Sequence, residues 1–132
     1  MNNPFENDPF AMVWQAFKNL YPDKDCICYF DVLEKNESGD TVYGETDFQD
    51  NGTMYVFVDA GLRLADAVEI FAHELAHVAV GSDADHGELW QSAFDAIFVE
   101  YNRIGNELFD KHDKIETING KACFREDGDG DG

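Results

Sequence analysis

Apolar residues in the first part of the chain recur every three or four positions, which is the spacing of one helix face. The stretch that follows residue 8 shows this spacing most clearly, with apolar side chains at Phe10, Val13, Trp14, Phe17 and Tyr21. Asp8 and Pro9 come before it in the order typical of a helix N-cap and first turn, and Pro22 follows it. The pattern therefore predicts a helix over about 9–20.

Three shorter stretches have the composition of strands. Residues 26–33 are apolar on both faces, residues 41–48 alternate weakly as in an outer strand, and residues 53–59 are the clearest strand of the chain. Asp50-Asn51-Gly52 lies between the last two and is a strong hairpin signal, because Asn and Gly tolerate positive φ. We expect a three-stranded, mostly antiparallel sheet.

Two more helices are predicted after the strands. Asp66 and Glu69 have the spacing of a capping box, and a helix from there ends near Val80, before Gly81.

The second of these helices is long. Asp85 and Glu88 repeat the capping-box spacing, and the helix runs from residue 86 or 87 to residue 111 or 112. Its apolar stripe consists of Leu89, Trp90, Phe94, Ile97, Phe98, Tyr101, Ile104 and Leu108.

The chain divides into one domain and two polar ends. Hydrophobic residues make up 44% of its 132 residues, which is enough for one core. We expect a flexible N-terminus over 1–8, an α+β domain over 9–115, and an acidic, Gly/Asp-rich disordered tail over 116–132.

The net charge of −19 narrows the range of partners. Such a surface repels nucleic-acid phosphates and anionic membranes, so neither direct nucleic-acid binding nor membrane binding is expected. It favours basic peptides and divalent metals. It also keeps open an alternative function, an acidic binding or inhibitor module that acts as a decoy for a basic partner.

The three cysteines, Cys26, Cys28 and Cys123, are too few and too sparse for a disulfide framework. Cys26 and Cys28 would point to the same face of a strand, where core packing is their simplest role. The chain shows neither a signal peptide at its start nor an apolar stretch of membrane-spanning length. A cytoplasmic location is the simplest expectation.

The most informative segment is His73-Glu74-Leu75-Ala76-His77. Histidines at i and i+4 share one helix face, so His73 and His77 can reach one metal ion, and Glu74 lies about 100° around the helix where it can reach a water on that ion. Zinc at a catalytic site takes a third protein ligand and keeps one open position. His86 is the natural third ligand, since the polar turn at Gly81 lets the chain reverse.

Other third ligands remain open. Glu100 on the last helix is the main alternative, because a carboxylate from a following helix serves this role in gluzincins. We interpret Asp83 and Asp85 primarily as a turn residue and a cap residue. Either could also fix the orientation of His86 without itself binding the metal.

The segment resembles a known family. His73-Glu74-Leu75-Ala76-His77, a short turn and then His86-Gly87-x-x-Trp90 are similar to the SprT-like (Spartan-type) zinc metallopeptidases, whose order of elements also fits. The resemblance implies a zincin-like fold, Zn²⁺ held by His73, His77 and His86, and Glu74 as the base. The Cys-rich zinc ribbon that often follows in this family is missing here, and the acidic charge does not fit a role on DNA.

On this basis the chain is expected to be a zinc metallopeptidase in which Glu74 activates a zinc-bound water for attack on a peptide bond. Tyr101 is a possible transition-state stabiliser, with Arg103 and Tyr55 as further candidates. We expect the strand at 53–59 to border the cleft and to pair with an extended peptide or protein substrate, possibly a basic one. A core helix without metal is the remaining alternative.

Overall fold

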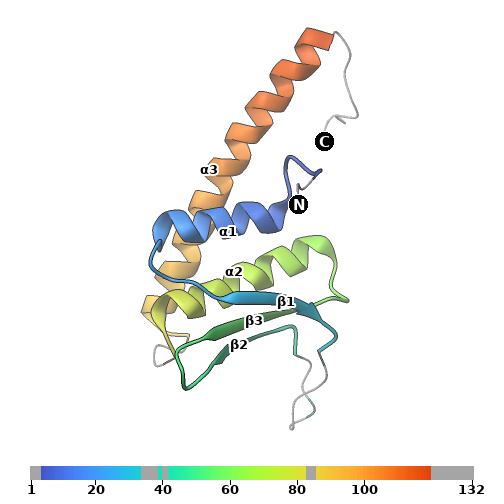
Figure 1. The fold of residues 1–132 in the computed structure, drawn as a ribbon. Helices are drawn as coiled ribbons and strands as arrows, with labels where there is room; N and C mark the ends of the chain where they lie inside the picture. The colour runs from blue at the N-terminus through green and yellow to red at the C-terminus, as the bar shows by residue number, and fades with distance from the viewer. Residues whose placement is uncertain (1–3, 34–38, 40–41, 83–85, 120–132) are drawn as a thin grey trace.

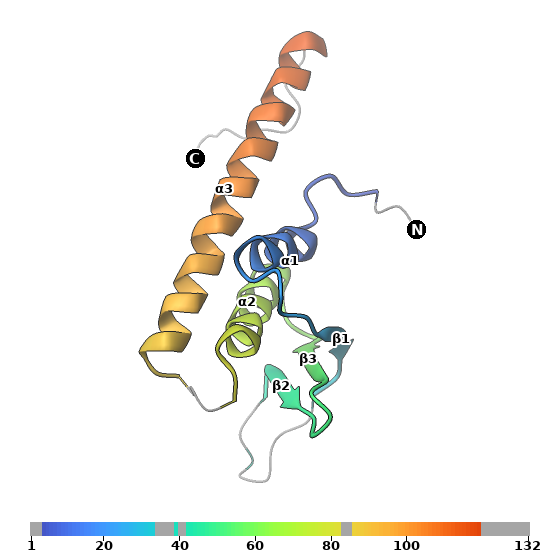
Figure 2. The same ribbon diagram turned by 60° about the vertical axis from the view of Figure 1, so that its left-hand side comes forward.

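The computed structural model describes residues 4–33, 39, 42–82 and 86–119, and their side chains up to residue 110. The chain forms three helices and one small sheet, an α+β arrangement, in the order α1 (Pro9–Leu20), β1 (Ile27–Asp31), β2 (Gly44–Phe48), β3 (Met54–Asp59), α2 (Leu64–Val80) and α3 (Glu88–Asn119). All three helices lie on the same side of the sheet, and the later part of α3 extends beyond the rest of the fold (Figures 1 and 2).

Helix α1 has the predicted bounds because its start is marked locally. Asp8 Oδ1 accepts hydrogen bonds from the backbone N–H groups of Phe10 (2.9 Å) and Ala11 (3.3 Å), and Pro9 occupies the first turn. The helix ends at Leu20, and Tyr21 caps it by donating its N–H to Phe17 O.

The sheet is mixed, not mostly antiparallel. Strand β3 lies in the middle, pairs parallel with β1 and pairs antiparallel with β2. The β2–β3 pair is the predicted hairpin, and Gly52 in its turn has φ +92°, a value that glycine adopts without strain. Because both edges of β3 are occupied, an added peptide cannot pair with it, and that expectation for residues 53–59 is wrong.

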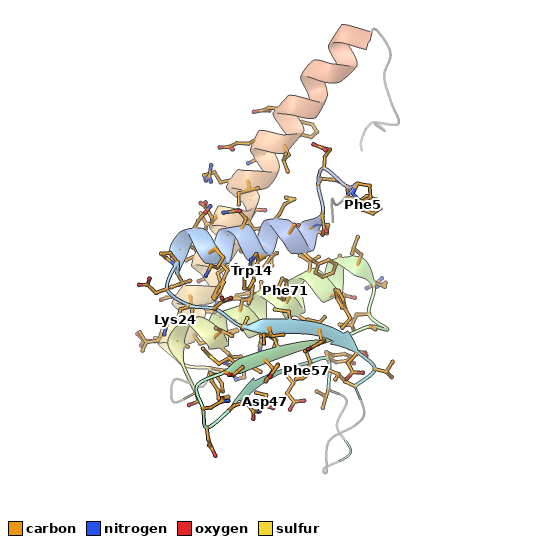
Figure 3. All side chains as sticks on the ribbon, in the orientation of Figure 1. Phe5, Trp14, Lys24, Asp47, Phe57 and Phe71 are labelled. Carbon is orange, nitrogen blue, oxygen red and sulfur yellow. The ribbon has the colours of Figure 1, made fainter. Side chains whose placement is uncertain are left out.

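Strand β1 is more exposed than its apolar composition predicts. All five of its residues are exposed, because it lies at the edge of the sheet and one of its faces has no helix over it. Figure 3 shows Phe57 and Asp47 on that uncovered side of the sheet, away from the helices.

Helix α2 begins before the predicted capping box. Its first residue is Leu64, and Asp66 lies within the first turn, where its carboxylate pairs with Arg63 at 3.2 Å. A carboxylate is favourable throughout the first turn of a helix, so Asp66 does not mark the cap position itself. Helix α3 begins at Glu88, one or two residues after its predicted start, and continues to Asn119, past its predicted end.

The core lies between β3 and the three helices. Figure 3 shows Trp14 and Phe71 on the facing sides of α1 and α2. The fully buried large side chains are Phe17, Leu75, Ile97, Val13, Val56 and Val78. They join the four elements and thereby hold α2 between the sheet and α3.

Several expectations fall outside the described residues. They concern Asp83, Asp85, Cys123 and the tail from residue 120 onward, together with the first three residues. Within the described part of the chain, no helix is long and apolar enough to cross a membrane.

Candidate metal centre

The three histidines of the motif come together at one end of α2. His73 and His77 lie one turn apart on α2, and Gly81, with φ +93°, ends the helix by donating its N–H to His77 O at 2.9 Å. The chain then turns, and His86 lies two residues before Glu88, the first residue of α3. The reversal at Gly81 thus brings a residue of the next segment back to the same helix face.

The imidazole nitrogens converge on one point. The Nε2 atom of His86 lies 3.0 Å from Nε2 of His77 and 3.1 Å from Nε2 of His73. One ligand atom from each of the three residues lies within 4.8 Å of the others. Among the described residues, these three form the group of His, Cys, Asp and Glu side chains that could hold a metal ion.

This spacing fits a single cation. Zinc–nitrogen bonds of about 2.0–2.1 Å in tetrahedral geometry place two ligand nitrogens roughly 3.3 Å apart, close to the distances observed. A proton on His86 Nε2 can be shared with only one neighbouring nitrogen at a time, whereas a central ion satisfies all three. The geometry therefore fits the predicted ligand set, and imidazole donors alone do not specify which metal binds.

Burial keeps one of the ligands neutral. The pKa of His73 is lowered to about 4, first because burial disfavours its charged form and then because of the neighbouring charges of His77 and His86. A neutral imidazole offers its lone pair to a metal without first losing a proton. His86 is exposed, so the centre is open to solvent on that side.

Trp90 forms one wall of the centre. Its indole Nε1–H donates to the backbone oxygen of His73 at 3.1 Å, and its ring centroid lies 4.7 Å from that of His73 and 4.9 Å from that of His86. The Trp90 side chain is itself buried and stacks on Phe94. It therefore ties α3 to the end of α2 that carries the ligands. The sequence predicts Trp90 as an apolar stripe residue but not this hydrogen bond.

Glu74 is the buried carboxylate among the residues whose side chains the structure describes, with 6% of its surface exposed. Thr46 Oγ1 in β2 donates to Glu74 Oε1 at 2.6 Å. Burial raises the pKa of Glu74 to about 7, the Thr46 hydrogen bond acts in the opposite direction, and the nearby charge of Glu45 raises it further.

The second oxygen of Glu74 also faces β2. A Cβ atom added to Gly44 would lie 2.8 Å from Glu74 Oε2 and 2.5 Å from Cγ2 of Ile70. Only glycine therefore allows β2 to approach α2 this closely. Gly44, Thr46 and Phe48 share one face of β2, and this period-2 alternation is the signal from which the contact could have been found.

The alternative ligand Glu100 does not join the histidines. About 18 Å of helix separate Glu88 from Glu100. The Glu100 carboxylate accepts hydrogen bonds from Arg103 and from Asn19 of α1. These bonds hold the pKa of Glu100 well below its usual range. Glu100 thus serves the α1–α3 contact.

The residues considered as transition-state stabilisers also take part in other contacts. Tyr101 is about 16 Å along α3 from Trp90, and its ring packs edge-on against Phe98 at 5.8 Å. Arg103 is bound to Glu100 and Glu107. Tyr55 stacks with the aromatic rings of the outer sheet face.

Comparison with known proteins does not assign a function, so the functional argument rests on the geometry of the site. No protein-family model, curated protein or solved structure matches this chain.

Proposed function

We propose that this protein is a zinc-dependent hydrolase of peptide bonds, with His73, His77 and His86 as the metal ligands and Glu74 as the general base. The observation that carries the proposal is the convergence of three imidazole nitrogens, two of them on α2, where the buried Glu74 directly follows His73 in the sequence. Three imidazole ligands and an open fourth side are typical of catalytic zinc. The resemblance of this segment to SprT-like metallopeptidases supports the same conclusion.

The residues of the chain have distinct tasks in this reaction. Zinc, when bound, supplies a Lewis acid that polarises the substrate carbonyl and acidifies water. Glu74 accepts the proton of the attacking water and returns it to the leaving amine. Its pKa of about 7 suits both steps near neutral pH. Thr46 holds the carboxylate in position through its 2.6 Å hydrogen bond.

The sheet edge nearest Glu74 supports a peptide as the substrate. Strand β2 carries Thr46 and lies at one edge of the three-stranded sheet. An extended peptide can add to such an edge through backbone hydrogen bonds. Glu45 and Asp47 on the same strand, together with the net charge of −19, favour basic peptides.

The direct test compares two carboxylate variants of α2 on a library of quenched fluorescent peptides. Glu74→Gln keeps the shape of the side chain but removes the base, so kcat/KM should fall by about 10²–10⁴-fold while bound zinc is retained. Glu69→Gln, at an exposed position of the same helix, should leave kcat/KM unchanged. Full activity in Glu74→Gln would remove Glu74 from the mechanism.

A second candidate function is an acidic binding module with a structural metal. The uncovered sheet face favours it, because Tyr29 stacks on Phe57 at 5.8 Å between ring centroids and Glu45 lies beside Phe57 in the sheet. Aromatic faces next to carboxylates bind cationic side chains. Binding of a Lys/Arg-rich peptide that Tyr29→Ala abolishes and Glu74→Gln preserves, without hydrolysis by the wild type, would select this function.

A further inference from the structure

A pair of thiols lies between α1 and β1. Cys26 Sγ and Cys28 Sγ are 3.7 Å apart. Both residues line a cavity of about 420 Å³, and its other walls include Phe10, Trp14, Phe30 and Phe71. The two side chains share one strand face, as their i, i+2 spacing predicts. They do not pack as two core cysteines, because Cys28 is exposed.

The two thiols differ in environment. Cys26 is half-buried and packs against the core, whereas Cys28 reaches solvent. The two sulfurs share one S–H···S hydrogen bond, in which either thiol can donate. A partly buried thiol keeps its proton more readily than an exposed one, which favours Cys28 as the thiolate. This bond and burial raise the pKa of Cys26, and the same bond lowers the pKa of Cys28.

The backbone allows the two sulfurs to approach. A disulfide needs an S–S distance of about 2.05 Å, so the sulfurs must close by roughly 1.7 Å. The β1–β3 ladder begins at Ile27, paired with Tyr55, and Cys26 lies just before it. The N–H of Cys26 donates to Asp25 Oδ1 at 2.9 Å, so moving Cys26 does not require its N–H to leave the sheet ladder.

We propose that Cys26 and Cys28 form a reversible dithiol–disulfide site that low-molecular-weight disulfides oxidise. The Cys28 thiolate attacks one sulfur of the oxidant RSSR, which forms a Cys28–SR mixed disulfide and releases RS⁻. Cys26 then loses its proton and attacks Cys28 Sγ, which forms the Cys26–Cys28 bond and releases the second RS⁻. Two electrons pass from the protein to the oxidant, and the two released thiolates take up the two protons of the pair.

The cavity beside the thiols has room for the departing group. Its volume of about 420 Å³ exceeds that of a small aliphatic thiol, and Asp8 lies at its wall. With Asp25 next to Cys26 and a net charge of −19, a cationic disulfide such as cystamine is favoured over an anionic one. The site does not involve the three histidines, so it is independent of the zinc proposal.

The test uses the full chain carrying Cys123→Ser, so that only the two thiols of the pair can react. The protein is treated with cystamine, the remaining thiols are blocked with N-ethylmaleimide, and the intact mass and the tryptic fragment 25–35 are measured. We expect a mass lower by two hydrogen atoms, no maleimide adduct, a fragment 25–35 with an internal disulfide, and recovery of both thiols with dithiothreitol.

Single-thiol variants provide the matched control. Cys26→Ser and Cys28→Ser, each combined with Cys123→Ser, lack the second thiol and should stop at a stable cysteamine adduct or remain reduced. If the two-thiol protein also stops at a persistent cysteamine adduct, or carries two maleimides after treatment, Cys26 does not resolve the mixed disulfide and the proposal is overturned.

Discussion

Thr46 in β2 and Glu74 in α2 are joined by a hydrogen bond of 2.6 Å from Oγ1 to Oε1. The two residues are 28 positions apart in the sequence. The bond satisfies a carboxylate that is 6% exposed, and it is made by a strand at the edge of the sheet. In the proposed reaction, β2 therefore orients the general base through this hydrogen bond.

Removing this hydroxyl should impair catalysis without removing the metal. Thr46→Ala should lower kcat by roughly tenfold, because a hydrogen bond to a charged group is worth about 1.5–3 kcal/mol and the base loses its orientation. The hydrogen bond lowers the pKa of Glu74, so its loss should also move the acid limb of the kcat–pH profile to higher pH. Both changes are measured on a fluorogenic peptide.

Two variants separate this role from a general loss of stability. Thr46→Ser keeps the hydroxyl and should restore kcat and the pH profile. Thr53→Ala, in the β2–β3 hairpin, should leave both unchanged. A Thr46→Ala protein with the wild-type kcat and acid limb would show that Thr46 does not position the base.

Gly44 should be required for packing of β2 on α2. Gly44→Ala places a Cβ 2.5 Å from Ile70 and 2.8 Å from Glu74, so we expect a loss of about 1–3 kcal/mol in the free energy of unfolding. Gly61→Ala is the control, since its Cβ meets only Asp59 Oδ2 at 3.8 Å. Urea denaturation measures both, and equal stability of the two variants would contradict the close approach.

Much of the helical structure follows from local sequence signals. Asp8 and Pro9 mark the start of α1, and Gly81 marks the end of α2, because caps and turns depend on a few adjacent residues. The start of α2 is not marked in this way, since Asp66 is equally favourable inside the first turn. The His73–His77 pair is likewise local, because i and i+4 share a helix face.

Contacts between distant segments could not be read in the same way. The parallel pairing of β1 with β3 places Ile27 beside Tyr55, and no local pattern distinguishes it from an antiparallel arrangement. The exposure of β1 and the Thr46–Glu74 bond both follow from that strand order. The sequence allows Glu100 as a metal ligand. Only the packing of α1 against α3 shows that its carboxylate binds Asn19 instead.

Charge on Glu74 should destabilise the metal-free protein as the pH rises. Its pKa is about 7 in the fold against 4.5 for an unperturbed Glu side chain, so its favourable contribution is complete below about pH 4.5 and is lost as the pH rises through 7. Glu74→Gln avoids this loss. The variant should be more stable than wild type near pH 8 by up to about 3 kcal/mol, since one pKa unit corresponds to about 1.4 kcal/mol.

The comparison is made by urea denaturation across pH with chelator present. His73 acts in the opposite direction, because its lowered pKa contributes stability above 6.5 that is lost as the pH falls through about 4. That effect is common to both proteins and cancels in their difference. The two stability curves should meet below pH 4.5, and a difference that does not depend on pH would contradict the burial of an ionisable Glu74.

Trp90 should support the metal through His73. Trp90→Phe keeps an aromatic wall but loses the hydrogen bond to His73 O, so we expect the zinc Kd to rise by about tenfold. Trp14→Phe alters the other tryptophan, which lines the cavity beside Cys26 and Cys28, and should leave the zinc Kd unchanged. Competition with a chromophoric chelator measures both values, and equal affinities would remove Trp90 from the support of the centre.

The central claim is a three-histidine zinc centre, and the most direct measurement is the zinc content of the purified chain by elemental mass spectrometry. Wild type, His86→Ala and Glu100→Gln are purified side by side without chelator. We predict one zinc per chain in wild type and in Glu100→Gln, and loss of most of it in His86→Ala. Zinc retained by His86→Ala, or wild-type protein that binds no zinc after reconstitution, would contradict the account.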